Sequence, residues 1–209
     1  MKPFLLSIRI SISRIRAEVN REMDAIIKKR IKQVLKGDQN AYAEIVEIYK
    51  DKVFQLCYRM LGNRHEAEDM AQEAFIRAYV NIASFNINLK FSTWLYRIAT
   101  NLCIDRIRKK KPDFYLDAEV SGTDGLTMYS QVAADTALPE EEVESIELQE
   151  IIQREISKLP EKYRSVIVLK YIEELSLNEI SEILDMPLGT VKTRIHRGRE
   201  ALRHQLRNV

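Results

Sequence analysis

Basic side chains gather near the C-terminus of the sequence, at a spacing that one helix would present on a single face. Residues 189–209 hold six Lys or Arg and one acid, Glu200. Cations arranged in this way neutralise phosphates, and their donors can also read base edges in a DNA groove. A helix with an ordinary solvated basic face is the alternative. The polar side of this stretch carries Lys192, Thr193, Arg194, His196, Arg197, Arg199 and Arg203.

The elements that must position these side chains follow a helix-turn-helix pattern. A short helix is expected over residues 178–184. A break follows at residues 185–187, because Pro187 cannot extend a helix but suits the first turn of the next one. Turn, hydrophobic period and charge agree, so the sequence predicts a DNA-binding unit. The buried side of its second helix is expected to hold Val191, Ile195, Ala201, Leu202 and Leu206.

A second region interleaves aromatic and basic residues. Residues 84–90 are expected to form a loop before a helix over residues 91–110. Aromatics beside cations suit a single-stranded nucleic acid, which needs stacking and phosphate neutralisation. Phe85 is expected to be exposed in the loop, whereas the helical spacing of Trp94 favours the core over a stacking platform. The residues concerned are Phe85, Lys90, Phe91, Trp94, Tyr96, Arg97, Arg106, Arg108, Lys109, Lys110 and Lys111.

A helix expected over residues 64–82 has an acidic face and an apolar face. Asn63 is expected to cap it, with Glu66 in the position that completes a capping box. We favour a solvated or partner-binding surface for the acidic face over a metal or acid–base site. The acidic stripe comprises Glu66, Asp69, Gln72 and Glu73. The apolar face comprises Ala67, Met70, Ala71, Ala74, Phe75, Ala78 and Tyr79.

The charge is distributed unevenly along the 209 residues, although its net value is only +2. Between Lys111 and Arg154 there is no Lys or Arg, while eleven Asp or Glu occur. Residues 113–145 are therefore expected to be a flexible acidic linker, and composition alone favours a tether over a mimic of nucleic acid. With only six Gly and five Pro, the chain is predicted to be all-α, with helical domains at 23–112 and 146–209.

Residues 1–22 alternate like a strand, but no later segment offers a partner strand. We expect a disordered extension, or one outside the native reading frame if Met23 is the true start. Cys57 and Cys103 are expected to be small core residues rather than metal ligands or a disulfide. No apolar run reaches the length that spans a bilayer, and a cytoplasmic location is expected.

Three segments together resemble the extracytoplasmic function sigma factors of the sigma-70 family, and most closely the sigma W type. They read HEAEDMAQEAFIRAY (65–79), KFSTWLYRIATNLCIDRIRKKKP (90–112) and LPEKYRSVIVLKYIEELSLNEISEIL…MPLGTVKTRIHRGREALR (159–203). The resemblance extends from about Met23 to the C-terminus. It departs from the usual pattern at Asp185, where relatives often have Gly, and at Ser181, where they often have Ala.

The resemblance implies a role for each candidate residue. Sigma region 2 (23–112) would bind the −10 promoter element through Phe85, Asn86, Lys90, Phe91, Arg97, Asn101 and Arg108, with a flipped base taken by the loop. Region 4 (146–209) would bind the −35 element through Lys170, Lys192, Thr193, Arg194, His196 and Arg197. Asp69, Gln72 and Glu73 would dock on the β′ clamp helices of core RNA polymerase, whose β flap is a further partner. The linker would thread the polymerase active-site cleft and RNA exit path.

The implied function is promoter recognition at envelope-stress genes by a dissociable, non-catalytic polymerase subunit, with no cofactor and no small-molecule substrate. The resemblance also implies an anti-sigma factor, membrane-anchored, that sequesters both domains. A stand-alone dimeric helix-turn-helix regulator is the alternative, but no sensor domain or coiled-coil seam supports it. An enzyme acting on nucleic acid would need a carboxylate, Cys or His constellation, and the sequence offers none.

Overall fold

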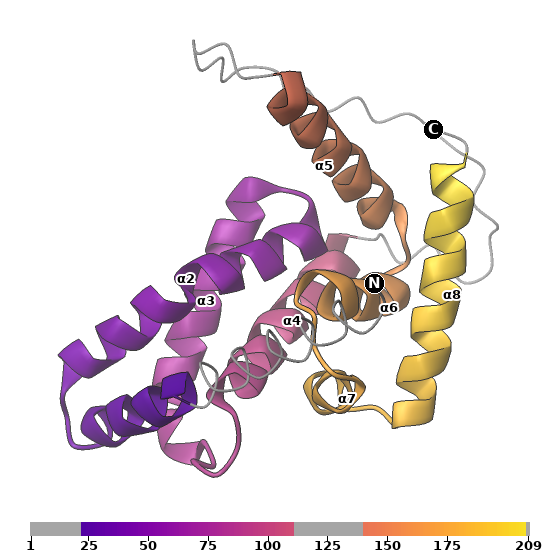
Figure 1. Ribbon diagram of the computed structural model, residues 1–209. Coiled ribbons are helices and arrows are strands. Elements are labelled where there is room, and N and C mark those ends of the chain that lie inside the picture. Colours follow the sequence, from indigo (N-terminus) through magenta and orange to yellow (C-terminus); the bar gives the residue numbers. More distant parts are fainter. Residues whose placement is uncertain (1–21, 111–139, 208–209) are drawn as a thin grey trace, which may run out of the picture.

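The computed structural model describes residues 22–110 and 140–207, and its side chains from residue 148 onward in the second of these ranges. Within these residues every regular element is helical and no strand occurs. The predictions for the extension at 1–21 and for residues 111–139 of the linker region lie outside the described residues. Figure 1 shows two groups of helices, the first coloured indigo to magenta and the second orange to yellow. The prediction of an all-α chain with two helical domains is confirmed.

The first domain comprises a helix over residues 22–34, α2 (Gln39–Leu61), α3 (Arg64–Val80), a short 3-10 helix (Ile82–Ser84) and α4 (Phe91–Lys110). Helices α2, α3 and α4 pack against one another in all three pairs. Alanines on α3 allow its neighbours to approach closely, because their side chains add little bulk. The core of the first domain includes Ile45, Val53, Leu56, Met60, Ala67, Ala74, Ala78, Leu95, Ala99 and Cys103.

Local capping sets the ends of these helices. The Asp38 carboxylate accepts backbone hydrogen bonds at the start of α2, at 3.0 Å from Asn40 and 3.3 Å from Ala41. Asn63 caps α3 through the backbone N–H of Glu66, at 3.0 Å. The second half of the predicted capping box does not form, because the Glu66 carboxylate binds cations of α4 instead. Tyr79, expected in the core, is 41% exposed.

The second domain comprises α5 (Glu140–Lys158), α6 (Glu161–Ile167), a π-helical segment (Val168–Ile172), α7 (Leu177–Leu184) and α8 (Leu188–Leu206). Helix α5 begins inside the range expected to be linker. Leu206, expected to be buried, is 40% exposed at the C-terminal end of α8. The core contains Ile156, Leu159, Val166, Leu169, Ile180, Ile183 and Val191.

The two domains are in contact. Helix α7 packs against α4, and α5 packs against α2 (Figure 1). Cys57 and Cys103 are buried free thiols in the first domain, as expected. No described helix is long and apolar enough to cross a membrane. The described residues hold no cluster of His, Cys, Asp and Glu suited to a metal ion.

Candidate nucleic-acid interface

The helix-turn-helix is held by local hydrogen bonds. Ser176 and Glu179 form a reciprocal capping box at the start of α7. Asp185 ends α7 in the left-handed region, with φ of 51°, a conformation that Asp tolerates better than most residues. The Ser181 hydroxyl donates to the carbonyl of Met186 at 2.6 Å and so fixes the turn. Both departures from the family pattern are therefore accommodated in this turn.

The outward side of α8 presents four of the residues proposed for the −35 element, and all four are exposed. We call these residues, Lys192, Thr193, His196 and Arg197, the α8 face. Thr193 donates its hydroxyl to the carbonyl of Gly189 at 3.0 Å, which leaves the oxygen lone pairs and the methyl group for a ligand. The face thus combines phosphate-binding cations with groups that can read base edges.

Lys170 does not lie on the α8 face, and Arg194 lies at its edge, where it lines a pocket with Thr193 and Arg197. Arg194 is half-buried and lines a polar cleft of about 680 Å³ between α8 and α4. Lys170 donates to the carbonyl of Leu175 at 3.1 Å, so its ammonium holds the turn before α7. The structure therefore brings together five of the six candidate residues of this group, four on the α8 face and Arg194 at its edge.

A second candidate surface runs along α4, and we call it the α4 stripe. It comprises Lys90, Arg97, Asn101 and Arg108, which are exposed and recur at helical spacing. Asn86 is also exposed in the preceding loop, where its side-chain oxygen accepts the backbone N–H of Asn88 at 3.0 Å. This arrangement can contact a nucleic-acid backbone along about five helical turns.

Phe85 and Phe91 do not belong to this surface, and the prediction of an exposed Phe85 is wrong. They are 8% and 3% exposed and pack together with Trp94. The ring centroid of Phe85 lies 5.5 Å from that of Phe91 and 5.1 Å from that of Trp94. The 3-10 helix before Phe85 turns the loop back over α4, and the Phe85 ring is therefore buried against this helix. The exposed apolar residue of the loop is instead Leu89, for which the sequence pattern carried no signal.

Carboxylates pair with several cations of α4. Glu66 of α3 binds Arg106 at 2.9 Å and Lys110 at 2.5 Å. Burial alone would raise the pKa of Glu66, but the hydrogen bonds from Lys110 and Arg106 outweigh it and hold that pKa below its usual value. Glu66 therefore ties α3 to α4 and does not take part in the exposed acidic face.

The exposed side of α3 joins acidic and apolar residues. Asp69 and Gln72 are exposed, and Glu73 is half-buried and paired with Arg77 at 2.7 Å. Ile76 and Val80 continue this side at 58% and 73% exposure. Apolar side chains so exposed beside charges are typical of a surface that binds another protein. We call these residues, Asp69, Gln72, Glu73, Ile76 and Val80, the α3 face.

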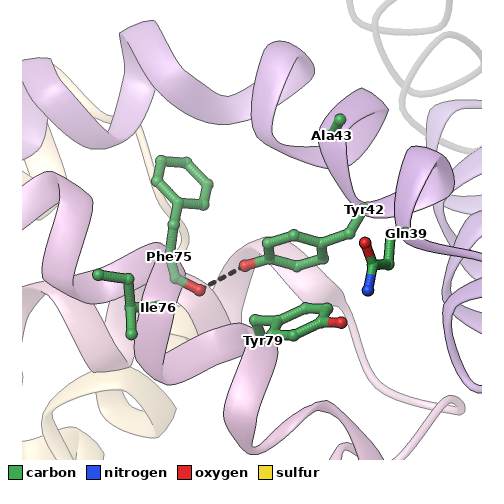
Figure 2. A pocket seen from close by; sticks show the side chains of 6 residues that line it. All are labelled: Gln39, Tyr42, Ala43, Phe75, Ile76 and Tyr79. Carbon is green, nitrogen blue, oxygen red and sulfur yellow. Dashed lines mark hydrogen bonds between the residues drawn. The ribbon is translucent and has the colours of Figure 1, made fainter. Parts of the chain in front are cut away.

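A shallow groove of about 420 Å³ adjoins the α3 face, between α3 and the start of α2 (Figure 2). The Tyr42 ring lies 4.8 Å from that of Tyr79, centroid to centroid, and its hydroxyl donates to the carbonyl of Phe75 at 2.5 Å. Burial raises the pKa of Tyr42, so this donor stays protonated. The groove offers apolar walls without catalytic groups, which suits a partner side chain better than a reaction.

Comparison with known proteins bears on these surfaces. Residues 45–112 match the family described as Sigma-70 region 2, and residues 149–202 match Sigma-70, region 4. The chain is 76% identical over 187 residues to the ECF RNA polymerase sigma factor SigW of Bacillus subtilis (strain 168), covering 90% of this chain and 100% of that protein. It is 37% identical over 176 residues to the ECF RNA polymerase sigma-E factor of Escherichia coli (strain K12), covering 82% and 90%.

Two solved structures share the fold. CnrH, in complex with the cytosolic domain of CnrY, has a TM-score of 0.64 at 21% identity and covers 88% of this chain and 98% of its own. The sigma factor RpoE of Bartonella quintana, in complex with the anti-sigma factor NepR, has a TM-score of 0.57 at 18% identity and covers 79% and 96%. With the sequence matches, these findings show that the chain belongs to the extracytoplasmic function (ECF) sigma factors of the sigma-70 family.

Proposed function

We propose that this protein binds core RNA polymerase and directs it to promoters, with the second domain on the −35 element and the first domain on the −10 element. The observation that carries the proposal is the presence, in one chain 76% identical to SigW, of a helix-turn-helix with an exposed basic helix and a separate cationic stripe. Two surfaces of this kind can grip two DNA sites at once. Polymerase supplies the catalysis.

In this proposal the α8 face enters the major groove of the −35 element. Lys192 and Arg197 neutralise phosphates or contact guanine, while Thr193 and His196 contact neighbouring base edges. Lys170 contributes through the turn before α7 rather than through base contacts, because its ammonium is held by the carbonyl of Leu175. Arg194, at the edge of the face beside Thr193 and Arg197, contacts a flanking phosphate.

The α4 stripe tracks the non-template strand of the opened −10 element. Asn101 and the loop residue Asn86 contact bases, and the cations Lys90, Arg97 and Arg108 contact phosphates. Unstacking a base costs a few kcal/mol, which the polymerase contacts must offset. Phe85 and Phe91 shape the loop from beneath rather than stack on a base.

The α3 face docks on the β′ clamp helices, which would bury Ile76 and Val80 beside the ionic contacts of Asp69, Gln72 and Glu73. The β flap binds the second domain, and residues 113–139 thread the polymerase cleft. We also propose a cytoplasmic location, envelope-stress target genes and a membrane-anchored anti-sigma partner. An anti-sigma partner is supported by the sigma factor RpoE of Bartonella quintana, which has the same fold and was solved in complex with the anti-sigma factor NepR.

Run-off transcription tests the proposal. The purified chain, combined with Bacillus subtilis core polymerase and a library of genomic promoter fragments, should yield transcripts from a defined subset. Gel shifts should show weak DNA binding by the free chain and tight binding with core polymerase. A chain that failed to bind core polymerase, or that bound promoters tightly and specifically alone, would contradict the proposal and favour a stand-alone regulator.

A further inference from the structure

We propose that the second domain masks the α4 stripe in the free protein by offering its own carboxylates in place of DNA phosphates. This inference rests on the proposed function, because it takes the α4 stripe to be a DNA-binding surface. It goes beyond that function by assigning a competitor, located in the same chain, for the same cations. The domains must separate before the first domain can bind DNA.

Three ion pairs carry the inference. Lys90 pairs with Glu179 at 2.8 Å, and Arg97 pairs with Asp185 at 3.2 Å. A third pair joins two further residues, Arg108 and Glu161, at 2.9 Å. Every cation of the α4 stripe is thus bound to a carboxylate of the second domain.

The three carboxylates come from separate places in the second domain. Glu179 lies in the first turn of α7, Asp185 in the turn between α7 and α8, and Glu161 at the start of α6. Carboxylate and phosphodiester oxygens accept the same charge-assisted hydrogen bonds from Lys and Arg. A cation held by one is not free for the other, so docking and DNA binding compete.

The fourth member of the stripe, Asn101, has no ion pair but lies beside the second domain. Asn101 lines the cleft of about 680 Å³ whose opposite wall includes Leu184, Met186 and Arg194. Helix α7 lies against α4 (Figure 1), and Leu184 at the end of α7 lines this cleft. A DNA strand that follows the stripe past Asn101 therefore meets the second domain at this cleft as well as at the three carboxylates.

The other end of the interface is held by polar contacts that fit closely. Gln153 is buried, and its amide lies 3.4 Å from the carbonyls of Tyr58 and Arg59 at the end of α2. Arg164 donates to the carbonyl of Met60 at 2.7 Å. Carbonyls at the end of a helix lack partners within it, so side chains of the second domain supply partners for those of Arg59 and Met60. The Tyr58 carbonyl also accepts the N–H of Gly62, at 2.8 Å. Such matched contacts distinguish a specific docked state from a chance collision of tethered domains.

The strength of the docked state suits a reversible mask. The carboxylates of Glu179 and Glu161 are partly shielded, whereas that of Asp185 is 83% exposed. Burial alone would raise the pKa of Glu179, but hydrogen bonds from Lys90 and Ser176 outweigh it and lower that pKa, which keeps the carboxylate charged at neutral pH. Exposed pairs of this kind are individually weak, so polymerase and DNA together can replace them.

A triple variant, E161Q/E179Q/D185N, tests the mask in the full chain. The amide oxygen introduced at position 179 can still accept the N–H of Ser176, and Asn tolerates the left-handed conformation at position 185. The matched control is E44Q/E47Q/E68Q, which makes the same change in net charge. Its carboxylates pair with Arg30, Lys50 and Arg64, all within the first domain.

Two readouts are measured: the radius of gyration by small-angle X-ray scattering, and the affinity for a fluorescein-labelled, mixed-sequence single-stranded DNA of 20 nucleotides. We expect the triple variant to expand and to bind the DNA about tenfold more tightly than the control variant. Arg59→Met, which breaks the 3.0 Å contact to Gln149 at the other end of the interface, should act in the same direction. It keeps the test decisive if circular dichroism shows that the triple variant misfolds.

Equal expansion and equal DNA affinity in the triple and control variants would overturn the inference. Run-off transcription by the wild-type holoenzyme separates this outcome from failure of the proposed function. If the holoenzyme initiates normally and the triple variant stays compact, the mask is wrong and the promoter function stands. If the triple variant expands while the holoenzyme does not initiate, the docking contacts are confirmed, and both the promoter function and the DNA-masking role are lost.

Discussion

Replacing Gly62 by alanine should separate the two domains, whereas replacing Gly37 should not. Both glycines end helices of the first domain with positive φ, at +69° for Gly62 and +96° for Gly37. A side chain in this region costs about 1–2 kcal/mol in backbone strain, so both substitutions should destabilise the first domain by a similar amount. Their surroundings differ: an added Cβ at Gly37 meets nothing within 4 Å.

At Gly62 the added Cβ would lie 2.6 Å from the Ser157 hydroxyl oxygen of the second domain. Real contacts are not that short, so Ser157 must rotate or the domains must move apart. Rotation breaks its 2.9 Å hydrogen bond to the carbonyl of Gln153 and its 3.3 Å contact with the Gln153 amide. At about 0.5–1.5 kcal/mol for each bond, the docked state loses roughly 1–3 kcal/mol, which exceeds the strength of any one exposed ion pair at the interface.

Two measurements separate the backbone strain within the first domain from the loss of contacts between the domains. Urea unfolding followed by the fluorescence of Trp94, the single tryptophan, reports the stability of the first domain and should fall by about 1–2 kcal/mol in both variants. Small-angle scattering reports docking, and only Gly62→Ala should increase the radius of gyration. An equal radius of gyration in the two variants would refute the clash between the Gly62 Cβ and Ser157. A Gly62→Ala variant no less stable than wild type would refute the backbone strain.

Three further predictions concern single side chains. Burial raises the pKa of Glu173, which hydrogen-bonds to Tyr96 across the interface, so the contribution of Glu173 to stability is full below pH 4.5 and is lost as pH rises through its folded-state pKa. Glu173→Gln should therefore raise the melting temperature at pH 7 but not at pH 4. A lower melting temperature at pH 7 would contradict this. Lys192→Ala should reduce the slope of log affinity against log salt for holoenzyme binding to promoter DNA by about 1, and an unchanged slope would exclude a phosphate contact. Phe85→Ala should destabilise the first domain by about 3–5 kcal/mol in urea unfolding, because it empties a place beside Phe91; a stable variant with weakened DNA binding would restore the stacking role.

Helix ends and the helix-turn-helix could be predicted because their signals are local. Asp38 and Asn63 accept hydrogen bonds from N–H groups two or three residues away, and Pro187 restricts its own φ. The same local logic applies to Asp185, because Asp is one of the few residue types that tolerate the left-handed conformation. These residues determine structure within one turn of themselves, so a linear pattern contains nearly all the information.

Side-chain destinations set by tertiary packing could not be predicted in the same way. Glu66 sits where a capping box needs it, yet cations some 40 residues away compete for its carboxylate and win. Two ion pairs, in which donor and acceptor are both charged, outweigh one hydrogen bond donated by a neutral backbone N–H. Tyr171 has the spacing of a buried helical residue, but the π-helical segment at 168–172 changes the period and leaves it 51% exposed.

The masking carboxylates show most clearly where sequence patterns stop. Glu179 already has a complete local explanation in its capping box, and Asp185 has one in the turn that it ends. Nothing in either pattern calls for a second partner, yet their cations lie 89 and 88 residues earlier in the chain. A carboxylate has lone pairs for both tasks, and only the packing of α7 against α4 brings the second partner within reach. Residues that satisfy a local rule can therefore also regulate access to a distant surface. The variants E179Q and D185N remove the charge but preserve the helix cap and the turn, so they can separate the masking role from the local structural role.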